Sequence, residues 1–543
     1  MPDIFLGQLY VTRCLQYFLR GFNHQPGVCH DCPHAHLELS RRAIQIFQRL
    51  LSVISGILAI KMGFYEWQLV LLVCVCIVTL LFERYASKRR EDGRKKDVDE
   101  RQATSNQRDA YKALSMKYLV VFGIVMGADW LQGPYLYSLY REQHGFPERF
   151  VAALFVTGFV SAGVAAPFIG VWADQHGRRT LCLTFCILYT LTCVLITVPS
   201  LPVLILGRIL GGISTSILFS AFESWLVSSS NSLSLPSSDL SAIMGKATLL
   251  NGFMAATAGV VSNQFVRATK DFTAPFIASG CVLLVGWCTI RATWSENFGS
   301  RDDSSETNGH SDPFQLHRLL SAWRIVRQDP RLLVLGLTQT CFEGCMYLFV
   351  FLWVPSLQEI SPNYPAESPP LGYIFSSFMI CMMLGSLLYS TISSRSLLQK
   401  PINAETEQEC LSVKFHAKLS TAVCATSALA LGSSVLFHDE RWRFYAFCAF
   451  EACVGMYYPV QGMLRGRLIR DENRATVSSL FRVPLNAFVV LSLMTGVASA
   501  RHAVLTASSG LLAFAALMMW VTIVHSSDLV SAESVLAVDA VDS

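Results

Sequence analysis

Charged residues are scarce in this 543-residue chain: Asp, Glu, Lys and Arg together make up 15% of it, whereas soluble domains contain about 25%. Hydrophobic residues make up 52%, and the mean hydropathy is +0.41. A soluble protein of this length could not bury so much apolar surface. The net charge of +4 gives no case for nucleic acid as a partner. The composition therefore excludes an ordinary soluble protein and indicates a chain that lies in a lipid bilayer.

Three sequence signals are also missing. No Asn-x-Ser/Thr acceptor occurs, so external N-glycosylation is not expected. No Walker A phosphate loop occurs, so direct ATP hydrolysis does not drive this protein, and we expect neither enzymatic activity nor a cofactor. The N-terminus shows no evident cleavable signal, because Arg13 and Arg20 interrupt its early segment.

The cysteines do not have the pattern of a disulfide framework. Thirteen of the 17 lie inside apolar runs, where cysteine acts as a small buried hydrophobic residue. The segment from Cys29 to Cys32, with His34 and His36, has the composition of a metal site. It has no second cysteine pair nearby, so we favour a loosely attached segment over a zinc site and expect no metal.

Thirteen apolar spans predict membrane helices, because a chain exposed to lipid must satisfy its backbone hydrogen bonds internally. The first span, Trp67–Phe82, is short and forms an extra N-terminal helix. The other twelve are core helices 1 to 12: Tyr118–Tyr140, Phe150–Ala173, Thr180–Ser200, Val203–Val227, Ile243–Val266, Phe272–Ile290, Leu332–Pro355, Leu371–Ser394, Leu419–Phe437, Phe444–Leu464, Ala475–Val497 and Ala503–Val524. The predicted class is an all-α polytopic membrane protein.

A polar linker, Arg291–Arg331, divides the twelve core helices into two sets of six. The two sets echo each other, since Ala221-Phe222-Glu223 in core helix 4 recurs as Ala449-Phe450-Glu451 in core helix 10. This favours an internal duplication. The predicted organisation is an extension (1–65), the extra helix (66–83), a basic cytoplasmic segment (84–117), a six-helix bundle (118–290), the linker (291–331), a second bundle (332–525) and an acidic cytoplasmic tail (526–543).

A short charged turn joins core helices 2 and 3. From Gly170 it reads Gly-Val-Trp-Ala-Asp-Gln-His-Gly-Arg-Arg. Its pattern, Gly170-x3-Asp174-x2-Gly177-Arg178-Arg179, resembles the signature loop of the major facilitator superfamily. The resemblance implies two six-helix bundles that rock about a central site, with this loop on the cytoplasmic side. It also implies that Asp174, Arg178 and Arg179 latch helix ends rather than bind substrate.

The distribution of basic residues predicts the orientation. With the signature loop in the cytoplasm, the loops on that side from Glu83 onward hold 27 Lys and Arg, and the opposite loops hold 7. Both ends of the core are then cytoplasmic. The extra helix places its own N-terminus outside unless Leu50–Ile60 turns back as a second short span.

Buried charge is confined to six core helices. Helices 2, 3, 6, 8, 9 and 12 carry no charged residue at membrane depth. Helices 1, 4, 5, 7, 10 and 11 carry Asp129, Arg208, Glu223, Lys246, Glu343, Glu451 and Arg482. Such groups cost about 2.5–3.5 kcal/mol each on insertion scales, so they face a cavity or a partner rather than lipid. In the major facilitator fold helices 1, 4, 7 and 10 line the cavity and 3, 6, 9 and 12 stand outside, and this chain respects that division.

Several longer strings are similar to the eukaryotic molybdate-anion transporter branch of the superfamily. They are Ala128–Tyr137 in core helix 1, Gly207–Gly212 and Ser220–Trp225 in helix 4, Phe349–Trp353 in helix 7, Ile374–Met379 in helix 8 and Phe481–Leu485 in helix 11. This resemblance implies uptake of molybdate across the plasma membrane by a protein that we expect to be monomeric. Molybdate is a tetrahedral dianion, which needs cations and hydrogen-bond donors at its site.

The substrate-binding candidates combine cations with polar side chains: Lys246, Arg482, Arg208, Asn251, Asn486, Gln132 and Tyr135. Arg482 and Asn486 share a helix face and Lys246 has a matching place in the other half, which predicts a two-sided clamp. The four acids Asp129, Glu223, Glu343 and Glu451 either pair with cations or are protonated, and Glu223 or Glu343 could couple transport to protons. Sulfate, an organic solute, or a non-transporting receptor role remain alternatives.

Overall fold

The computed structural model describes residues 63–94, 105–298, 323–361, 368–396, 405–469, 471–495 and 500–525. The chain divides into two units, Met1–Gly63 and Phe64–Ser543, and the elements described below all belong to the second. Within the described ranges every regular element is a helix, which confirms the all-α prediction. The predictions about Cys29–Cys32, most of the 291–331 linker and the acidic tail concern residues outside these ranges.

The first half of the described chain begins with the extra helix and continues through the first six core helices. Its elements are α3 (Phe64–Arg94), α4 (Ser105–Gln132), η1 (Gly133–Tyr135), α5 (Leu136–Ser138), η2 (Leu139–Gln143), α6 (Glu148–His176), α7 (Arg178–Ile196), α8 (Leu201–Leu218), α9 (Ala221–Ser232), α10 (Ser237–Thr269) and α11 (Ala274–Thr293). Two predicted helices are interrupted. Core helix 1 changes to a 3-10 turn at Pro134, which has no N–H to donate, and core helix 4 breaks between Leu218 and Ala221.

The second half contains the last six core helices. Its elements are α13 (Pro330–Ile360), α14 (Leu371–Ser396), α15 (Glu405–Leu436), α16 (Glu440–Leu468), α17 (Asp471–Met494), α18 (Arg501–Met519) and η4 (Trp520–His525). The predicted core spans coincide with these helices in the main, but some run past a helix end: Thr180–Ser200 extends beyond α7, Phe272–Ile290 begins before α11, and Ala475–Val497 extends beyond α17. Among the described residues, 10 helices are long and apolar enough to cross a membrane. The core helices that do not qualify, α10, α16 and α17, carry Lys246, Glu451 and Arg482, three of the predicted cavity charges.

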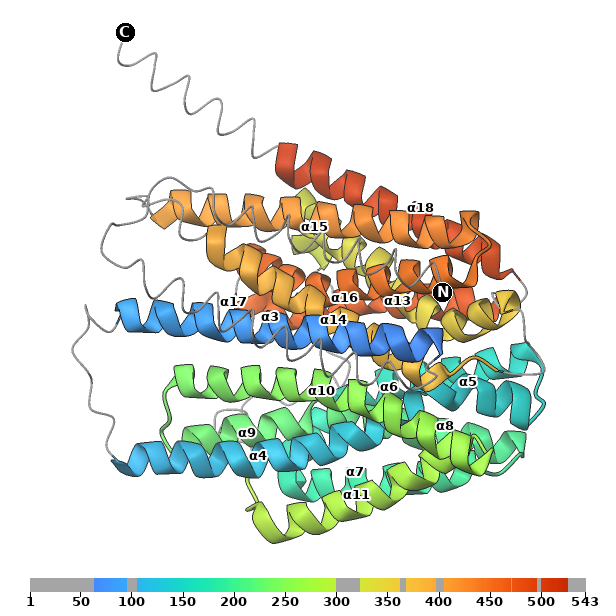
Figure 1. Ribbon diagram of the computed structural model, residues 1–543. Coiled ribbons are helices and arrows are strands. Elements are labelled where there is room, and N and C mark those ends of the chain that lie inside the picture. The colour runs from blue at the N-terminus through green and yellow to red at the C-terminus, as the bar shows by residue number, and fades with distance from the viewer. Residues whose placement is uncertain are drawn as a thin grey trace, which may run out of the picture. The chain divides into compact units, whose positions relative to one another are not determined.

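Helix packing follows the same pattern in both halves (Figure 1). In the first half α4 packs on α10 and α11, α6 on α8, and α7 on α8 and α11. In the second half α13 packs on α17 and α18, α14 on α16, and α15 on α16 and α18. Each pair in one half has its counterpart six core helices later, which is the arrangement that an internal duplication produces.

The halves meet through α10 against α14 and through α6 against α17. At the first contact the backbones come so close that a Cβ added to Gly372 would lie 2.3 Å from the carbonyl oxygen of Gly259. The extra helix α3 packs along α14. It also reaches the first half, because Glu66 pairs with Arg267 of α10 at 3.4 Å. Close packing of this kind links the two halves near α10 and α14.

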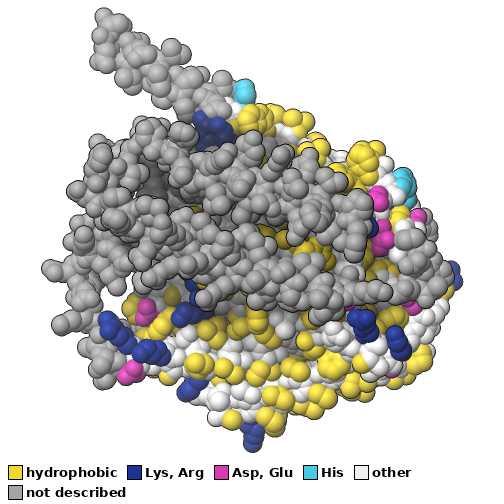
Figure 2. Space-filling model, in the orientation of Figure 1, with side chains coloured by type: hydrophobic (Ala, Val, Ile, Leu, Met, Phe, Trp, Pro, Cys, Tyr) yellow, Lys and Arg dark blue, Asp and Glu magenta, His cyan; other side chains and the backbone are white. Residues whose placement is uncertain are grey.

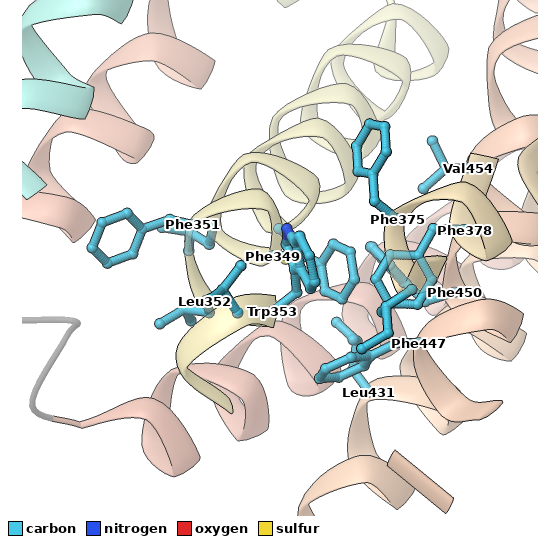
Figure 3. Packing of buried hydrophobic residues seen from close by; sticks show 14 of the residues in the cluster. Phe349, Phe351, Leu352, Trp353, Phe375, Phe378, Leu431, Phe447, Phe450 and Val454 are labelled. Carbon is cyan, nitrogen blue, oxygen red and sulfur yellow. The ribbon is translucent and has the colours of Figure 1, made fainter. Parts of the chain in front are cut away.

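Aromatic residues fill the core of the second half (Figure 3). The ring centroid of Phe349 lies 4.9 Å from that of Phe450 and 5.0 Å from that of Phe447. On the outer surface, Figure 2 shows apolar side chains over much of the described face, with charged side chains towards its margins. An apolar exterior is what a helix bundle in lipid presents, and it leaves the polar groups to be placed inside.

Candidate functional site

A charged cluster lies inside the second half, around Glu343 of α13. The Glu343 side chain is 9% exposed, and its carboxylate accepts hydrogen bonds from Gln339 Nε2 at 3.4 Å and Tyr457 Oη at 3.5 Å. Arg465 Nη1 of α16 donates to Gln339 Oε1 at 3.4 Å. Arg465 and Arg482 both act electrostatically on the Glu343 carboxylate. One acid and two arginines from three helices therefore share this region.

A cavity of about 200 Å³ lies where the two halves face each other. Its walls come from α6, α13 and α17: Phe159, Val160, Gly163, Val164, Tyr347, Asn486, Val489 and Val490. Asn486 contributes an amide to an otherwise largely apolar lining. Arg482, one helical turn earlier, is exposed and acts electrostatically on Tyr347. The predicted Arg482–Asn486 pair thus lies beside an inter-half cavity, where a small solute could bind.

The predicted charges of the first half do not gather in one place. The Tyr189 hydroxyl donates to Asp129 Oδ1 at 2.6 Å. Lys246 Nζ donates to the Tyr111 hydroxyl at 2.8 Å and lies 5.0 Å from the centre of its ring. These groups are partnered within the first half, and Lys246 remains exposed.

Four other predicted residues make hydrogen bonds within the protein. Asn251 Oδ1 accepts from Trp130 Nε1 at 2.7 Å, Gln132 Nε2 donates to Ser279 Oγ at 3.0 Å, the Tyr135 hydroxyl donates to Asn263 Oδ1 at 2.8 Å, and Arg208 Nε donates to the Leu154 carbonyl at 3.1 Å. Gln132 and Tyr135 are buried, and both bridge helices of the first half. Their hydrogen bonds help to set helix positions, so a role in binding stays a prediction for this group.

The two remaining acids lie in contrasting surroundings. Glu451 is 5% exposed and fully enclosed by α16 and its neighbours, with no ion pair among the described residues. Glu223, in the first turn of α9, is exposed and lines a second cavity of about 550 Å³. Arg178 and several serines line the same cavity. A group that reaches an open cavity can exchange protons with solvent more readily than one that is enclosed.

The signature loop has the backbone that its glycine predicts. Gly177 separates α6 from α7 and adopts a φ of 95°, a conformation that side chains with a Cβ disfavour. The Glu296 carboxylate accepts from the backbone N–H of Arg179 at 2.8 Å and of Thr180 at 3.1 Å, which caps the start of α7. Arg178 Nη1 donates to the Ser224 carbonyl of α9 at 3.3 Å. The side chain of Asp174 and the surroundings of Gly170 lie outside what the structure describes.

Two arginines are central to the structure and were missed from the sequence. Arg465 follows the predicted end of core helix 10, and Arg443 precedes its predicted start. In the structure α16 extends beyond both, and Arg443 is 1% exposed and donates to the carbonyls of Ser434 at 3.0 Å and Ser356 at 2.8 Å. The predicted span ended beside each arginine because arginine commonly flanks a membrane helix, and so neither residue was considered part of the core. The signal that could have found them is that the helix continues past both, over Glu440–Leu468.

The fold agrees with solved transporter structures. Crystal structures of the nucleoside transporter NupG, as a single-residue mutant and unmutated, match with TM-scores of 0.59 and 0.54, at 9% and 10% identity. Each match covers 75% of this chain and 99% of that chain. At such low identity the likeness shows the fold alone. A family model described as sugar transporters with 12 transmembrane segments matches residues 94–430.

The family model, together with two relatives from fish, places the chain in the major facilitator superfamily of multi-pass membrane proteins, within its molybdate-anion transporter branch. A Molybdate-anion transporter of Takifugu rubripes is 31% identical over 411 residues, covering 71% of this chain and 80% of the relative. One of Danio rerio is 33% identical over 407 residues, covering 71% and 79%. Both resemblances predicted from sequence are confirmed.

Proposed function

We propose that this protein is a secondary-active transporter that takes up molybdate across the cell membrane by alternating access. The observation that carries the proposal is the similarity to relatives named molybdate-anion transporters, at 31% to 33% identity over most of the chain. We take the orientation predicted from the count of basic residues, in which the signature loop and both ends of the core lie in the cytoplasm. The protein would work as a monomer.

The second half supplies the stronger chemistry for binding an oxyanion. Arg482 is exposed one helical turn before Asn486, whose amide lines the inter-half cavity. A guanidinium group recognises tetrahedral oxyanions through charge-assisted hydrogen bonds, which are about twice as strong as neutral ones. Lys246, from the first half, supplies the other side of the predicted clamp. Arg208 has one Nε–H committed to the Leu154 carbonyl and is a secondary candidate.

Rocking about the contacts between halves would expose the site to each side in turn. The signature loop lies at one end of α6, and Arg178 links it to α9. Breaking and remaking such loop contacts would hold the cytoplasmic ends together in one state and free them in the other.

Proton coupling would require a carboxyl group that gains and loses its proton during the cycle. Our candidates are Glu223, which lines the open cavity, and Glu343, on which two arginines act electrostatically. Glu223→Gln should abolish any pH dependence of uptake while binding is retained. An unaltered pH profile would remove Glu223 from this role.

The decisive test of the function is accumulation of radiolabelled molybdate by cells that express the protein, with excess sulfate as competitor. Uptake above that of untransfected cells, resistant to sulfate, is the expected result. Uptake that sulfate abolishes would indicate a general oxyanion carrier. No uptake would favour an organic solute or a receptor role, both of which the fold permits.

A further inference from the structure

Carboxylates of the first half are bound by donors of the second half at the end of the helices opposite the signature loop. Glu142, in η2, accepts from Gln358 Nε2 at 2.7 Å and from Ser368 Oγ at 3.0 Å. Glu148, at the start of α6, pairs with Arg501 at the start of α18. We call these five residues the rim cluster. It joins the two halves at the side that the basic-residue count assigns to the outside.

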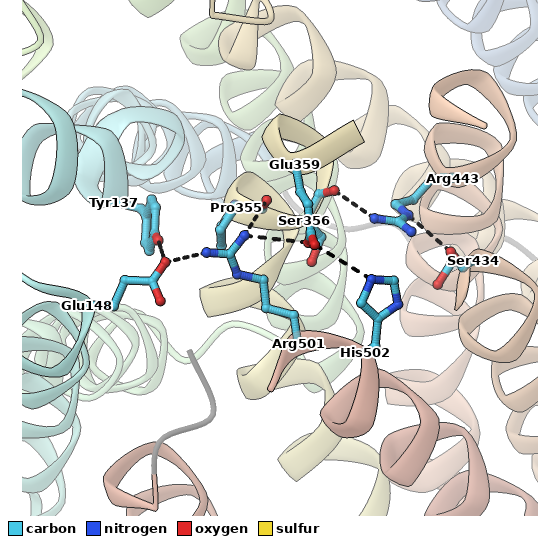
Figure 4. A network of polar contacts seen from close by, with 9 residues as sticks. All are labelled: Tyr137, Glu148, Pro355, Ser356, Glu359, Ser434, Arg443, Arg501 and His502. Atoms are coloured by element: carbon cyan, nitrogen blue, oxygen red, sulfur yellow. Dashed lines mark hydrogen bonds and ion pairs between the residues drawn. The ribbon is translucent and has the colours of Figure 1, made fainter. Parts of the chain in front are cut away.

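The second half holds Arg501 in place independently of Glu148 (Figure 4). Arg501 Nη1 donates to the Pro355 carbonyl at 3.2 Å and lies 3.5 Å from Glu359 Oε2. Its guanidinium group is therefore positioned before any partner arrives from the first half. Arg501 and Glu148 are 25% and 17% exposed, so their ion pair is less screened by water than one on an open surface.

We propose that Gln358, Ser368 and Arg501 form an entry site for the oxyanion substrate, and that Glu142 and Glu148 occupy it while the outward side is closed. The inference rests on the proposed function and its orientation. A carboxylate and a tetrahedral oxyanion offer the same thing to these donors, namely negatively charged oxygen acceptors. When the halves separate at this end, the donors lose the carboxylates and face the external solution.

This exchange couples substrate arrival to opening. The substrate can reach the three donors only when the carboxylates have left, so it binds the open state and shifts the population towards it. Glu359 stays beside Arg501 and partly neutralises it, so the site should hold the anion weakly. Weak binding suits an entry site, from which the anion must pass on to the interior.

Phe351 provides a reporter of opening that does not depend on transport. Its ring is 1% exposed and packs on two rings of the first half just inside the rim, with centroid distances of 5.7 Å to Tyr137 and 5.2 Å to Phe155. Separation of the halves at this end would expose it. A Phe351→Cys protein, labelled from outside with a membrane-impermeant maleimide, measures that exposure against the same protein without the new cysteine.

The parent protein carries Phe351→Cys alone. In the absence of molybdate, the same protein with Glu142→Gln and Glu148→Gln added should be labelled about tenfold faster than the parent, because the charged acceptors that hold the outer end closed are gone. Added molybdate should accelerate labelling of the parent severalfold. Arg501→Gln should label fast and no longer respond to molybdate. Arg149→Gln, at the same end of α6 but exposed, is the matched control and should behave as the parent.

Parent labelling that does not respond to molybdate, in a protein that takes molybdate up, would overturn the entry site and leave the proposed function intact. An Arg501→Gln protein that responds as the parent does would also overturn it. Absence of both uptake and response would instead reject molybdate as the substrate. The amount of each variant at the surface is measured by labelling after denaturation, so poor folding is recognised.

Discussion

The two halves of this transporter share their helix packing but differ in how they place charge. The pairing of α4 with α10 and α11 recurs as the pairing of α13 with α17 and α18. In the first half Asp129 and Lys246 are each bonded to a separate tyrosine. In the second half Arg465 and Arg482 both act electrostatically on the one carboxylate of Glu343. The two halves thus share their backbone arrangement, as an internal duplication would produce, whereas the contacts made by their charged residues differ.

The largest effect should come from breaking what the halves share. In Gly372→Leu the first side-chain carbon would lie 2.3 Å from the Gly259 carbonyl, so α10 and α14 must move apart. We expect a loss of at least about 1–3 kcal/mol of stability and little protein at the surface. Thermal unfolding in detergent checks this. Gly245→Leu, also on a core helix but with nothing within 4 Å of the new carbon, is the control and should remain stable.

The next test asks whether binding is as uneven as the charge placement. Arg482→Met removes a cation beside the inter-half cavity, and the half-saturation concentration for molybdate should rise roughly 10- to 100-fold. Lys246→Met should raise it less, about fivefold, because Lys246 already shares its charge with Tyr111. An equal rise in the half-saturation concentration for the two variants would support a clamp in which both halves contribute equally. Unchanged uptake in both variants would reject these cations as ligands.

The helical fold could be predicted from the sequence because lipid imposes a simple rule. Long apolar spans must be helices, and a charge in such a span must face inward. The positive φ of Gly177 follows from a single residue, whereas the break at Pro134 interrupts a span that the sequence predicted as one continuous helix. The extent of α16 could not be predicted this way, because arginine, which lies near both of its ends, is also the residue type expected just outside a membrane helix.

The polar site was harder to predict because hydrogen-bond partners depend on tertiary packing. Gln132 and Tyr135 have the chemistry of ligands, yet they bond to Ser279 and Asn263, which lie more than a hundred residues away. No local sequence pattern predicts a hydrogen bond between residues so far apart in the chain. Charge placement on helices was readable from the sequence, whereas which charges meet was not, and Arg465 near Glu343 is the clearest example.

Arg465 tests the contribution of the second-half cluster around Glu343, and its replacement should have an effect of intermediate size. Arg465→Met removes the hydrogen bond to Gln339 and one of the two positive charges near Glu343. We expect about a tenfold rise in the half-saturation concentration, since one charged contact contributes roughly 1.5 kcal/mol or more. Arg467→Met, two residues along the same helix and exposed, is the matched control and should change it less than about twofold. Equal effects would mean that general positive charge at the end of α16 is what matters.

The smallest effects should separate Asp129 and Glu343, two of the acids that accept hydrogen bonds from tyrosines. The Tyr189–Asp129 hydrogen bond measures 2.6 Å, whereas Tyr457 lies 3.5 Å from Glu343, which has other partners. Tyr189→Phe leaves the Asp129 carboxylate without its hydrogen bond, and we expect a loss of about 1 kcal/mol. Tyr457→Phe keeps the ring stacked on Phe342, whose centroid is 3.9 Å away, and should cost less than about 0.5 kcal/mol. Unfolding midpoints of both variants in one detergent give the comparison. A larger loss for Tyr457→Phe would show that the second-half cluster depends on that hydroxyl, and that its acid is held as rigidly as Asp129.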